Sequence, residues 1–209
     1  MAVKIEHFTI GPIGTNVYVA YDEALKEAVV IDPADRGGDI YEAVSNAGLT
    51  VTGILLTHGH FDHIGGVNEL KKLSGCRIYA SSKEEELLSD SDLNESGSMG
   101  REPVTATADV WLEDGDSINI GGMNIVAIYT PGHTIGSISY YLEKEKVLFS
   151  GDTLFNESVG RTDFPTGSMS MIIDSVNNKL LVLPEDVIVY PGHGPSTSIG
   201  NEKKYNPFI

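Results

Sequence analysis

Short apolar runs alternate with amphipathic stretches along most of the chain. Runs of three to eight residues rich in Val, Ile, Leu, Tyr and Phe, bounded by turn-forming residues, predict β-strands. The predicted strands are Val3–Ile10, Val17–Ala20, Ala28–Ile31, Gly53–Leu56, Arg77–Ala80, Ile125–Tyr129, Ile138–Leu142, Val147–Phe149 and Val187–Tyr190.

Between these runs, apolar residues recur at the three-to-four spacing of a helix that buries one face. The predicted helices are Gly38–Ala47, Ile64–Leu73, Lys83–Leu88 and Ser168–Leu181, the last with Ser168 as its N-cap. Within the third helix, Glu84-Glu85-Glu86 is predicted to be a solvated face. The polar, glycine-rich segment 89–103 predicts a surface loop, and Asp114-Gly115-Asp116 and Gly121-Gly122 predict the turns of short hairpins.

The order of these elements repeats weakly within the chain. A strand ending at Asp32 is followed by a helix and then by the strand before His58. Later, the strand before Asp152 is followed by a helix and then by the strand before His193. Two such α/β halves facing each other would bring their strand ends to one edge, where open α/β sheets hold ligands. Histidines far apart in the sequence would then converge.

Composition limits the classes of protein that fit. At 209 residues and 41% hydrophobic content, one large domain is expected. A formal net charge of −16 disfavours nucleic acid as a partner. The chain begins without a basic and apolar leader and has no apolar run of about 20 residues, so we expect a cytoplasmic protein with no membrane partner. Cys76, the single cysteine, gives no disulfide framework and is expected to be a small buried hydrophobe.

The candidate chemistry lies in the histidines. Thr57–His63 places three imidazoles and one carboxylate directly after an apolar run, and His133 and His193 each follow a Pro-Gly pair. Only His7 lies outside this pattern, and we expect it to be an ordinary surface or core residue. Since imidazole is the commonest protein ligand of transition metals, the sequence predicts a metal site.

Asp152 follows a strand and a Ser-Gly pair, where it could cap a turn or bridge two cations through its two oxygens. With it, there are seven candidate ligands: His58, His60, Asp62, His63, His133, Asp152 and His193. Seven donors are too many for one tetrahedral ion and suit two ions with open positions. A closed structural zinc site would use four ligands, commonly cysteines, so a catalytic site is favoured.

These motifs, together with Asp32, resemble those of the metallo-β-lactamase superfamily, appear in the family's order and cover most of the chain. The resemblance implies a single domain over residues 1–209 with a four-layer αβ/βα sandwich and the metals at the edge between its two sheets. It implies that Asp32 organises the histidine loop, although a turn residue before Pro33 is nearly as good an interpretation. It also implies a first metal on His58, His60 and His133, a second on Asp62, His63 and His193, and Asp152 as the bridge.

Within the superfamily, Gly160–Pro165 and Asn206-Pro207-Phe208 look most like short proteins similar to glyoxalase II (hydroxyacylglutathione hydrolase), without the C-terminal helical domain. That resemblance implies thioester hydrolysis by a hydroxide bridging two divalent metals. Zinc is the first candidate, and iron or manganese also suit the ligands. Asp62 and Asp152 would be the catalytic carboxylates. Arg161 would contact an anionic substrate such as an S-acylglutathione, or else pair with Asp163.

Other activities on the same fold stay open. A persulfide dioxygenase would hold one iron on His58, His133 and Asp152, and Gly160–Phe164 also resembles that family. A nuclease is disfavoured because the lysines and arginines are few and scattered. Antibiotic hydrolysis is ranked low, because true β-lactamases usually differ where Asp152 stands. Metal storage or a structural clip is disfavoured by the open coordination positions. The sequence predicts no oligomeric state.

Overall fold

Two mixed β-sheets form the centre of the computed structural model, which describes residues 3–97 and 102–209. Six strands of the described residues make the first sheet, with β1 to β3 antiparallel and β3 to β6 parallel. In sheet order they are β1 (Val3–Ile10), β2 (Thr15–Asp22), β3 (Glu27–Ile31), β4 (Thr50–Leu55), β5 (Arg77–Ser81) and β6 (Val110–Leu112).

The second sheet also has six strands among the described residues. In sheet order they are β7 (Ser117–Ile120), β8 (Met123–Tyr129), β9 (Ile138–Leu142), β10 (Val147–Gly151), β13 (Ile188–Pro191) and β14 (Thr197–Ser198). Strands β7 to β10 are antiparallel, β10 and β13 are parallel, and β14 returns antiparallel. A separate small hairpin joins β11 (Leu154–Phe155) to β12 (Ser158–Val159).

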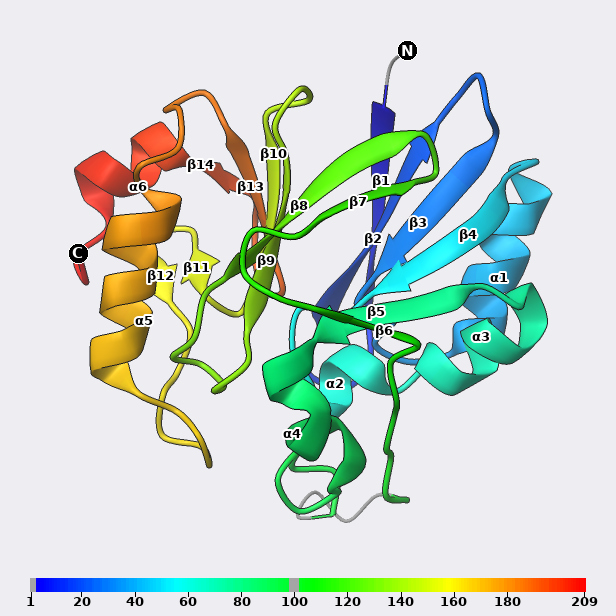
Figure 1. Ribbon diagram of the computed structural model, residues 1–209, viewed down its shortest axis with the longest axis horizontal. Helices are drawn as coiled ribbons and strands as arrows, with labels where there is room; N and C mark the ends of the chain where they lie inside the picture. The colour runs from blue at the N-terminus through cyan, green and yellow to red at the C-terminus, as the bar shows by residue number, and fades with distance from the viewer. Residues whose placement is uncertain (1–2, 98–101) are drawn as a thin grey trace.

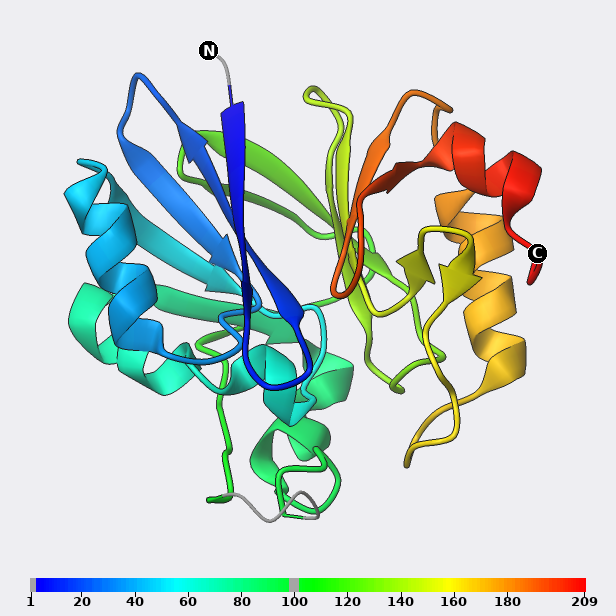
Figure 2. The same cartoon turned by 180° about the vertical axis from the view of Figure 1, so that it is seen from behind.

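Helices cover the outer face of each sheet (Figures 1 and 2). On one side lie α1 (Gly37–Asn46) and α3 (Val67–Ser74), and on the other lie α5 (Met169–Ser175) and α6 (Ile199–Tyr205). Two short helices, α2 (Phe61–Ile64) and α4 (Glu85–Ser89), follow β4 and β5. The order of layers is helix, sheet, sheet, helix, which confirms the predicted four-layer sandwich.

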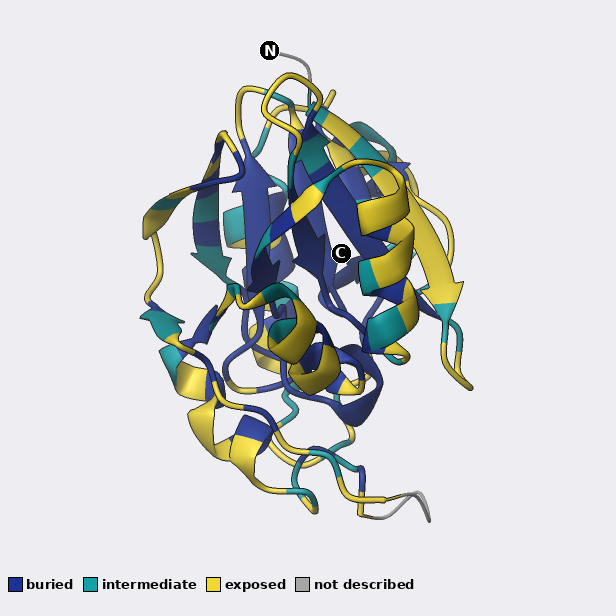
Figure 3. Cartoon of the chain, turned by 90° about the vertical axis from the view of Figure 1, so that its right-hand side faces the viewer, coloured by how far each residue is buried: buried dark blue, intermediate teal, exposed yellow. Residues whose placement is uncertain are grey.

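Side chains alternate between the two faces of each strand, as the period of two requires. In β3, Val29 faces the core between the sheets, while Val30 faces the cluster under α1 and α3. In β10, Phe149 faces the core between the sheets, and Leu148 packs with Ile172 of α5. Figure 3 shows the result, with buried strands in the middle and helices exposed on their outer faces.

The repeat seen in the sequence is confirmed in the structure. β3 and β4 are parallel and are joined through α1, and β10 and β13 are parallel and are joined through α5. Each half is therefore a β–α–β unit whose parallel strands end at the carboxyl edge of their sheet. This arrangement brings the residues after β4, β10 and β13 to one region of the molecule.

Two predictions of secondary-structure elements were wrong. The single helix Ile64–Leu73 is broken at Gly65 and Gly66, because the loop after β3 lies against both glycines. The amide of Gly66 donates to the carbonyl of Pro33 at 2.7 Å, and a Cβ on Gly65 would lie 2.3 Å from the carbonyl oxygen of Ala34. The turn at Asp114–Asp116 joins β6 of one sheet to β7 of the other, so it closes no hairpin.

The remaining predicted elements match with small shifts at their ends. The turn at Gly121-Gly122 closes the β7–β8 hairpin, and the hydroxyl of Ser168 caps α5 by accepting from the amide of Met171. The segment 89–103 is largely irregular where described, and its residues 98–101 lie outside the described residues.

Cys76 is half-buried against the core under α1 and α3. Among the described residues, no helix has the length and apolar character needed to span a membrane.

Candidate metal centre

The seven predicted donors meet at the edge where both β–α–β units end. His58 and His60 follow β4, and Asp62 and His63 lie on α2, near the middle of the lower edge in Figure 1. The other three, His133, Asp152 and His193, follow β8, β10 and β13 respectively. Three combinations have donor atoms within 4.8 Å of one another: His58, His60 and His133; His58, His63 and Asp152; Asp62, His63 and His193. His7 is exposed on β1, as expected of the one histidine outside the pattern.

We call His58, His60 and His133 the first donor group. The Nδ1 atom of His60 lies 2.9 Å from the Nε2 atom of His133, so two ring nitrogens converge. Burial holds the pKa of His58 well below its usual range and lowers that of His60 to about 3, and neighbouring imidazoles add to both shifts. Both rings are therefore neutral at pH 7, and a neutral imidazole has the lone pair that a metal needs.

We call Asp62, His63 and His193 the second donor group. The Oδ2 atom of Asp62 lies 3.2 Å from the Nε2 atom of His193 and 3.4 Å from that of His63, and it accepts a hydrogen bond from the hydroxyl of Thr15 at 2.7 Å. Burial alone would lower the pKa of His63, but the carboxylates of Asp62, Asp152 and Asp32 raise it well above its usual range. The carboxylates thus favour the protonated form of His63 in metal-free protein, in contrast to the neutral rings of His58 and His60.

Asp152 lies between the two donor groups. Its Oδ1 atom is 3.4 Å from the Nε2 atom of His63, and its Oδ2 atom is 3.5 Å from the Nε2 atoms of both His133 and His193. Burial raises the pKa of this carboxyl, but the three imidazoles outweigh it and the net shift is downward. A carboxylate that contacts both groups is placed where a bridging ligand would have to be.

Hydrogen bonds from behind fix the orientation of several rings. The carboxylate of Asp32 accepts from the Thr57 amide at 2.7 Å and from the Thr57 hydroxyl at 2.6 Å, and it lies 2.9 Å from the Nδ1 atom of His63. The Thr57 hydroxyl lies 3.1 Å from the Nδ1 atom of His58. Such outer contacts turn the opposite nitrogen of each ring toward the site. Asp32 thus contacts the histidine loop, as its predicted supporting role requires.

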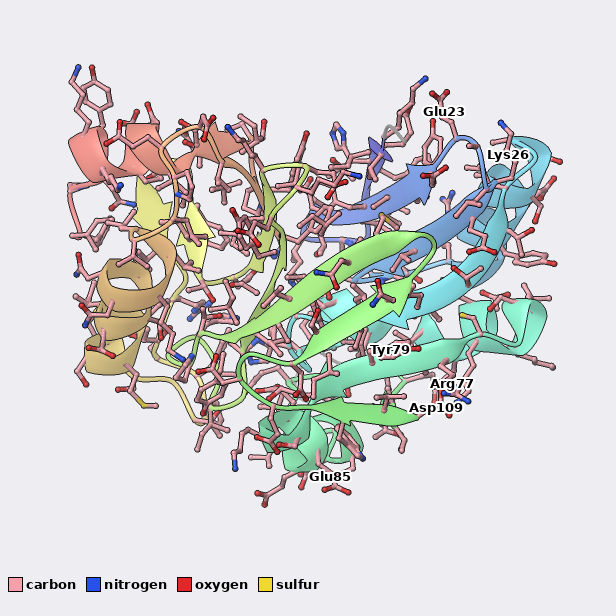
Figure 4. The ribbon with its side chains drawn as sticks, turned by 45° about the horizontal axis from the view of Figure 1, so that its top comes forward. Glu23, Lys26, Arg77, Tyr79, Glu85 and Asp109 are labelled. Atoms are coloured by element: carbon pink, nitrogen blue, oxygen red, sulfur yellow. The ribbon has the colours of Figure 1, made fainter. Side chains whose placement is uncertain are left out.

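Glu84 contradicts the prediction that Glu84-Glu85-Glu86 is a solvated face. Its side chain is buried, whereas Glu85 and Glu86 are exposed, and Figure 4 shows Glu85 on the outer side of α4. Burial raises the pKa of Glu84 to about 7. A signal was present in the sequence, because Glu84 shares a helical face with Leu87 and Leu88, which are both buried.

A cleft of about 560 Å³ opens onto the donors. Its wall is mainly aromatic and aliphatic, and Arg161 lines it. The guanidinium of Arg161 pairs with Asp163 through two contacts of 2.7 Å and lies 3.9 Å from the ring centre of Phe164. The structure therefore shows the Arg161–Asp163 ion pair, whereas contact between Arg161 and a substrate stays a prediction.

The donor set fits a pair of metal ions. Three buried donor atoms that face the site have no hydrogen-bond partner among the described residues: Nε2 of His58, Nε2 of His63 and Oδ1 of Asp152. Buried polar atoms without a partner are costly in free energy, and cations placed among these atoms would satisfy them. The ligand roles of the seven residues stay predictions that this geometry supports.

Comparison with known proteins establishes the family. The sequence model of the metallo-β-lactamase superfamily matches residues 10–193, and the chain belongs to this superfamily of metallo-hydrolases. The probable metallo-hydrolase YqgX of Bacillus subtilis is 38% identical, and the match covers 99% of this chain and 98% of that protein. The hydroxyacylglutathione hydrolase GloC of Haemophilus influenzae is 34% identical, with 99% and 98% covered.

Solved structures agree with this assignment. The crystal structure of the B3 metallo-β-lactamase BLEG-1 matches with a TM-score of 0.93 at 43% identity, covering 98% of this chain and 99% of that one. TTHA1623 in a di-iron-bound form has a TM-score of 0.87 at 33% identity, with 98% and 100% covered. ETHE1 from Myxococcus xanthus has a TM-score of 0.83 at 32% identity, with 98% and 83% covered.

Proposed function

We propose that the protein hydrolyses the thioester bond of a small anionic thioester such as an S-acylglutathione, using two divalent metal ions. The observation that carries the proposal is the position of Asp152, which lies within 3.5 Å of His133 from the first donor group and of His63 and His193 from the second. One carboxylate shared by two donor groups suits a pair of ions better than a single ion.

Two bound divalent ions, with zinc as first candidate and iron or manganese as alternatives, lower the pKa of water and favour negative charge on a carbonyl oxygen. The chain itself supplies neutral imidazoles from His58 and His60 and carboxylates from Asp62 and Asp152. Arg161 would bind a carboxylate of the substrate at the rim of the cleft, after opening its exposed pair with Asp163. A departing thiolate is a good leaving group, so no further acid is required.

The comparisons support parts of this proposal. GloC, 34% identical over 209 residues, is named a hydroxyacylglutathione hydrolase, which favours a glutathione thioester. The di-iron form of TTHA1623 favours a two-metal centre and shows iron as a metal to test.

Two other activities have an observation in their favour. A persulfide dioxygenase would use one iron on His58, His133 and Asp152, and these three lie together, with the two rings 4.7 Å apart and His133 3.5 Å from Asp152. β-Lactam hydrolysis is favoured by the likeness to BLEG-1, which is named a B3 metallo-β-lactamase. Both activities belong in the same assay series.

The test is a set of assays on one preparation of known metal content. We expect hydrolysis of S-lactoylglutathione, with neither oxygen uptake on glutathione persulfide nor turnover of a chromogenic cephalosporin at a comparable rate. Protein stripped with a chelator is the control, and adding back zinc, iron or manganese should restore hydrolysis. Oxygen uptake with one iron per chain, or cephalosporin turnover without thioester hydrolysis, would overturn the proposal.

A further inference from the structure

A buried carboxylate outside the donor cluster joins the two loops that carry the first donor group. Glu84 is 1% exposed and lies on the turn between β5 and α4. Its Oε2 atom accepts from the amide of Gly59 at 2.9 Å, between His58 and His60. Its Oε1 atom accepts from the amide of Gly136 and the hydroxyl of Thr134, both at 2.6 Å, just after His133.

Two features of the surroundings of Glu84 require a carboxylate at this position. The two amides can only donate, and the Thr134 hydroxyl donates too, so the group between them must accept at both oxygens. The backbone is also packed closely here. A Cβ on Gly136 would lie 2.5 Å from the carbonyl carbon of Lys83, and one on Gly59 would lie 2.6 Å from Leu87 Cδ2. Both loops are therefore packed closely against the segment of Lys83 to Leu87, and each is hydrogen-bonded to Glu84.

We propose that Glu84 is a positioning residue for the first metal, because it fixes the loop of His58 and His60 relative to the loop of His133. The second donor group takes its support elsewhere, since Asp32 lies against His63 and Thr15 donates to Asp62. Loss of Glu84 should therefore weaken one metal subsite selectively. This inference rests on the two-metal centre of the proposed function, and it does not depend on a thioester being the substrate.

The deciding variant is Glu84→Gln. An amide presents one oxygen and one NH₂ group, so whichever way it turns, the N–H of Gly59 or that of Gly136 faces another donor. Metal-free protein would be titrated with Co²⁺ and with Zn²⁺ in competition with a chelator, which gives two dissociation constants. We expect one constant to rise about tenfold and the other to change by less than about twofold. The visible absorption of the Co²⁺ form should change for the weakened subsite only.

The chain offers a matched control in Glu202, which is fully buried in the other half of the molecule. Its carboxylate accepts from Thr197, Asn201, Asn206 and the amide of Glu157, and so ties α6 to the β11–β12 hairpin. Glu202→Gln makes the same chemical change to a buried carboxylate of similar bonding. We expect it to lower the unfolding temperature at least as much as Glu84→Gln, while both metal constants stay as in the wild type.

Thr134→Val is a milder variant, because it removes one of the three bonds to Glu84 and keeps the shape of the side chain. It should weaken the same subsite by about threefold, which tests the inference even if Glu84→Gln fails to fold. Wild-type metal affinity at both subsites of Glu84→Gln and Thr134→Val would overturn the inference. It would also be overturned if these variants weakened both subsites equally, or if Glu202→Gln weakened metal binding as much as Glu84→Gln does. Two metals without thioester turnover in the wild type would overturn the proposed function and leave this inference standing.

Discussion

The two β–α–β halves place an aspartate at the same point and use it differently. Asp32 follows β3 and Asp152 follows β10, and both are buried. Asp32 has a left-handed backbone, with φ of 49°, and directs its carboxylate to Thr57 and His63 from behind the donor cluster. Asp152 lies among the donors themselves, and its Oδ1 atom has no hydrogen-bond partner among the described residues.

The two β–α–β units have the same topology, but they contribute different sets of side chains to the site. The first half contributes four donors from one continuous segment, His58, His60, Asp62 and His63, and its aspartate accepts two hydrogen bonds from Thr57 at the start of that segment. The second half contributes separate donors from the ends of different elements, and its aspartate faces the other donors. We therefore expect changes at Asp152 to act on function and changes at Asp32 to act on stability as well.

Asp152→Ala should have the largest effect. Removing the shared carboxylate should lower thioester hydrolysis at least about a thousandfold and reduce the metal content, because both donor groups lose the contact. The circular dichroism spectrum should stay that of the wild type, since the contacts of the Asp152 carboxylate are with the imidazoles of His63, His133 and His193. Full activity in this variant would refute the bridging assignment.

Asp32→Asn should affect the stability of the fold as well as metal binding, unlike Asp152→Ala. Asparagine tolerates the left-handed backbone, but its NH₂ group replaces an acceptor that Thr57 or His63 requires. We expect the unfolding free energy to fall by about 2 kcal/mol and metal affinity by about 10- to 100-fold. Chemical denaturation and metal titration measure the two effects. A variant with wild-type stability would show that Asp32 is only a turn residue.

The histidines of the two halves should also titrate differently in metal-free protein. Burial holds the pKa of His60 at about 3, against an ordinary value of 6.5, whereas Asp62 and Asp152 raise the pKa of His193 although burial opposes it. Because the pKa of His60 is lowered on folding, its contribution to stability is present above pH 6.5 and is lost as the pH falls toward 3. The contribution of His193 runs the other way and is lost as the pH rises through its raised pKa. Imidazole NMR resolves both; a His60 that protonates near pH 6.5 would contradict the burial argument.

Arg161→Ala should have the smallest effect. The side chain is exposed and paired with Asp163, so its loss should barely change the midpoint of thermal unfolding. If it binds an anionic substrate, KM should rise by about three- to tenfold with little change in kcat. Asp163→Ala is the matched control: it breaks the same ion pair but keeps the cation, so KM should stay level or fall. Equal KM values in all three proteins would make the ion pair purely structural.

Local pattern in the sequence predicts the strands, the repeat and the donors, whereas the four-layer sandwich was implied by the resemblance to the superfamily. Val29 and Val30 alternate between faces, and His58, His60, Asp62 and His63 lie within six residues, so their meeting needs no long-range knowledge. The burial of Glu84 could have been predicted from the helical face that it shares with Leu87 and Leu88, but its hydrogen-bond partners could not, because they are 25, 50 and 52 residues away in the sequence. The helix break at Gly65-Gly66 depends in the same way on the loop of Pro33 and Ala34.

The central claim is that Asp152 joins two donor groups into one two-metal centre. Elemental analysis of purified wild-type protein and of Asp152→Ala, each saturated with zinc and freed of excess metal, tests it most directly. The account predicts about two ions per chain in the wild type and at most about one in the variant. A fully active wild type with a single ion, or a variant that retains two, would contradict it.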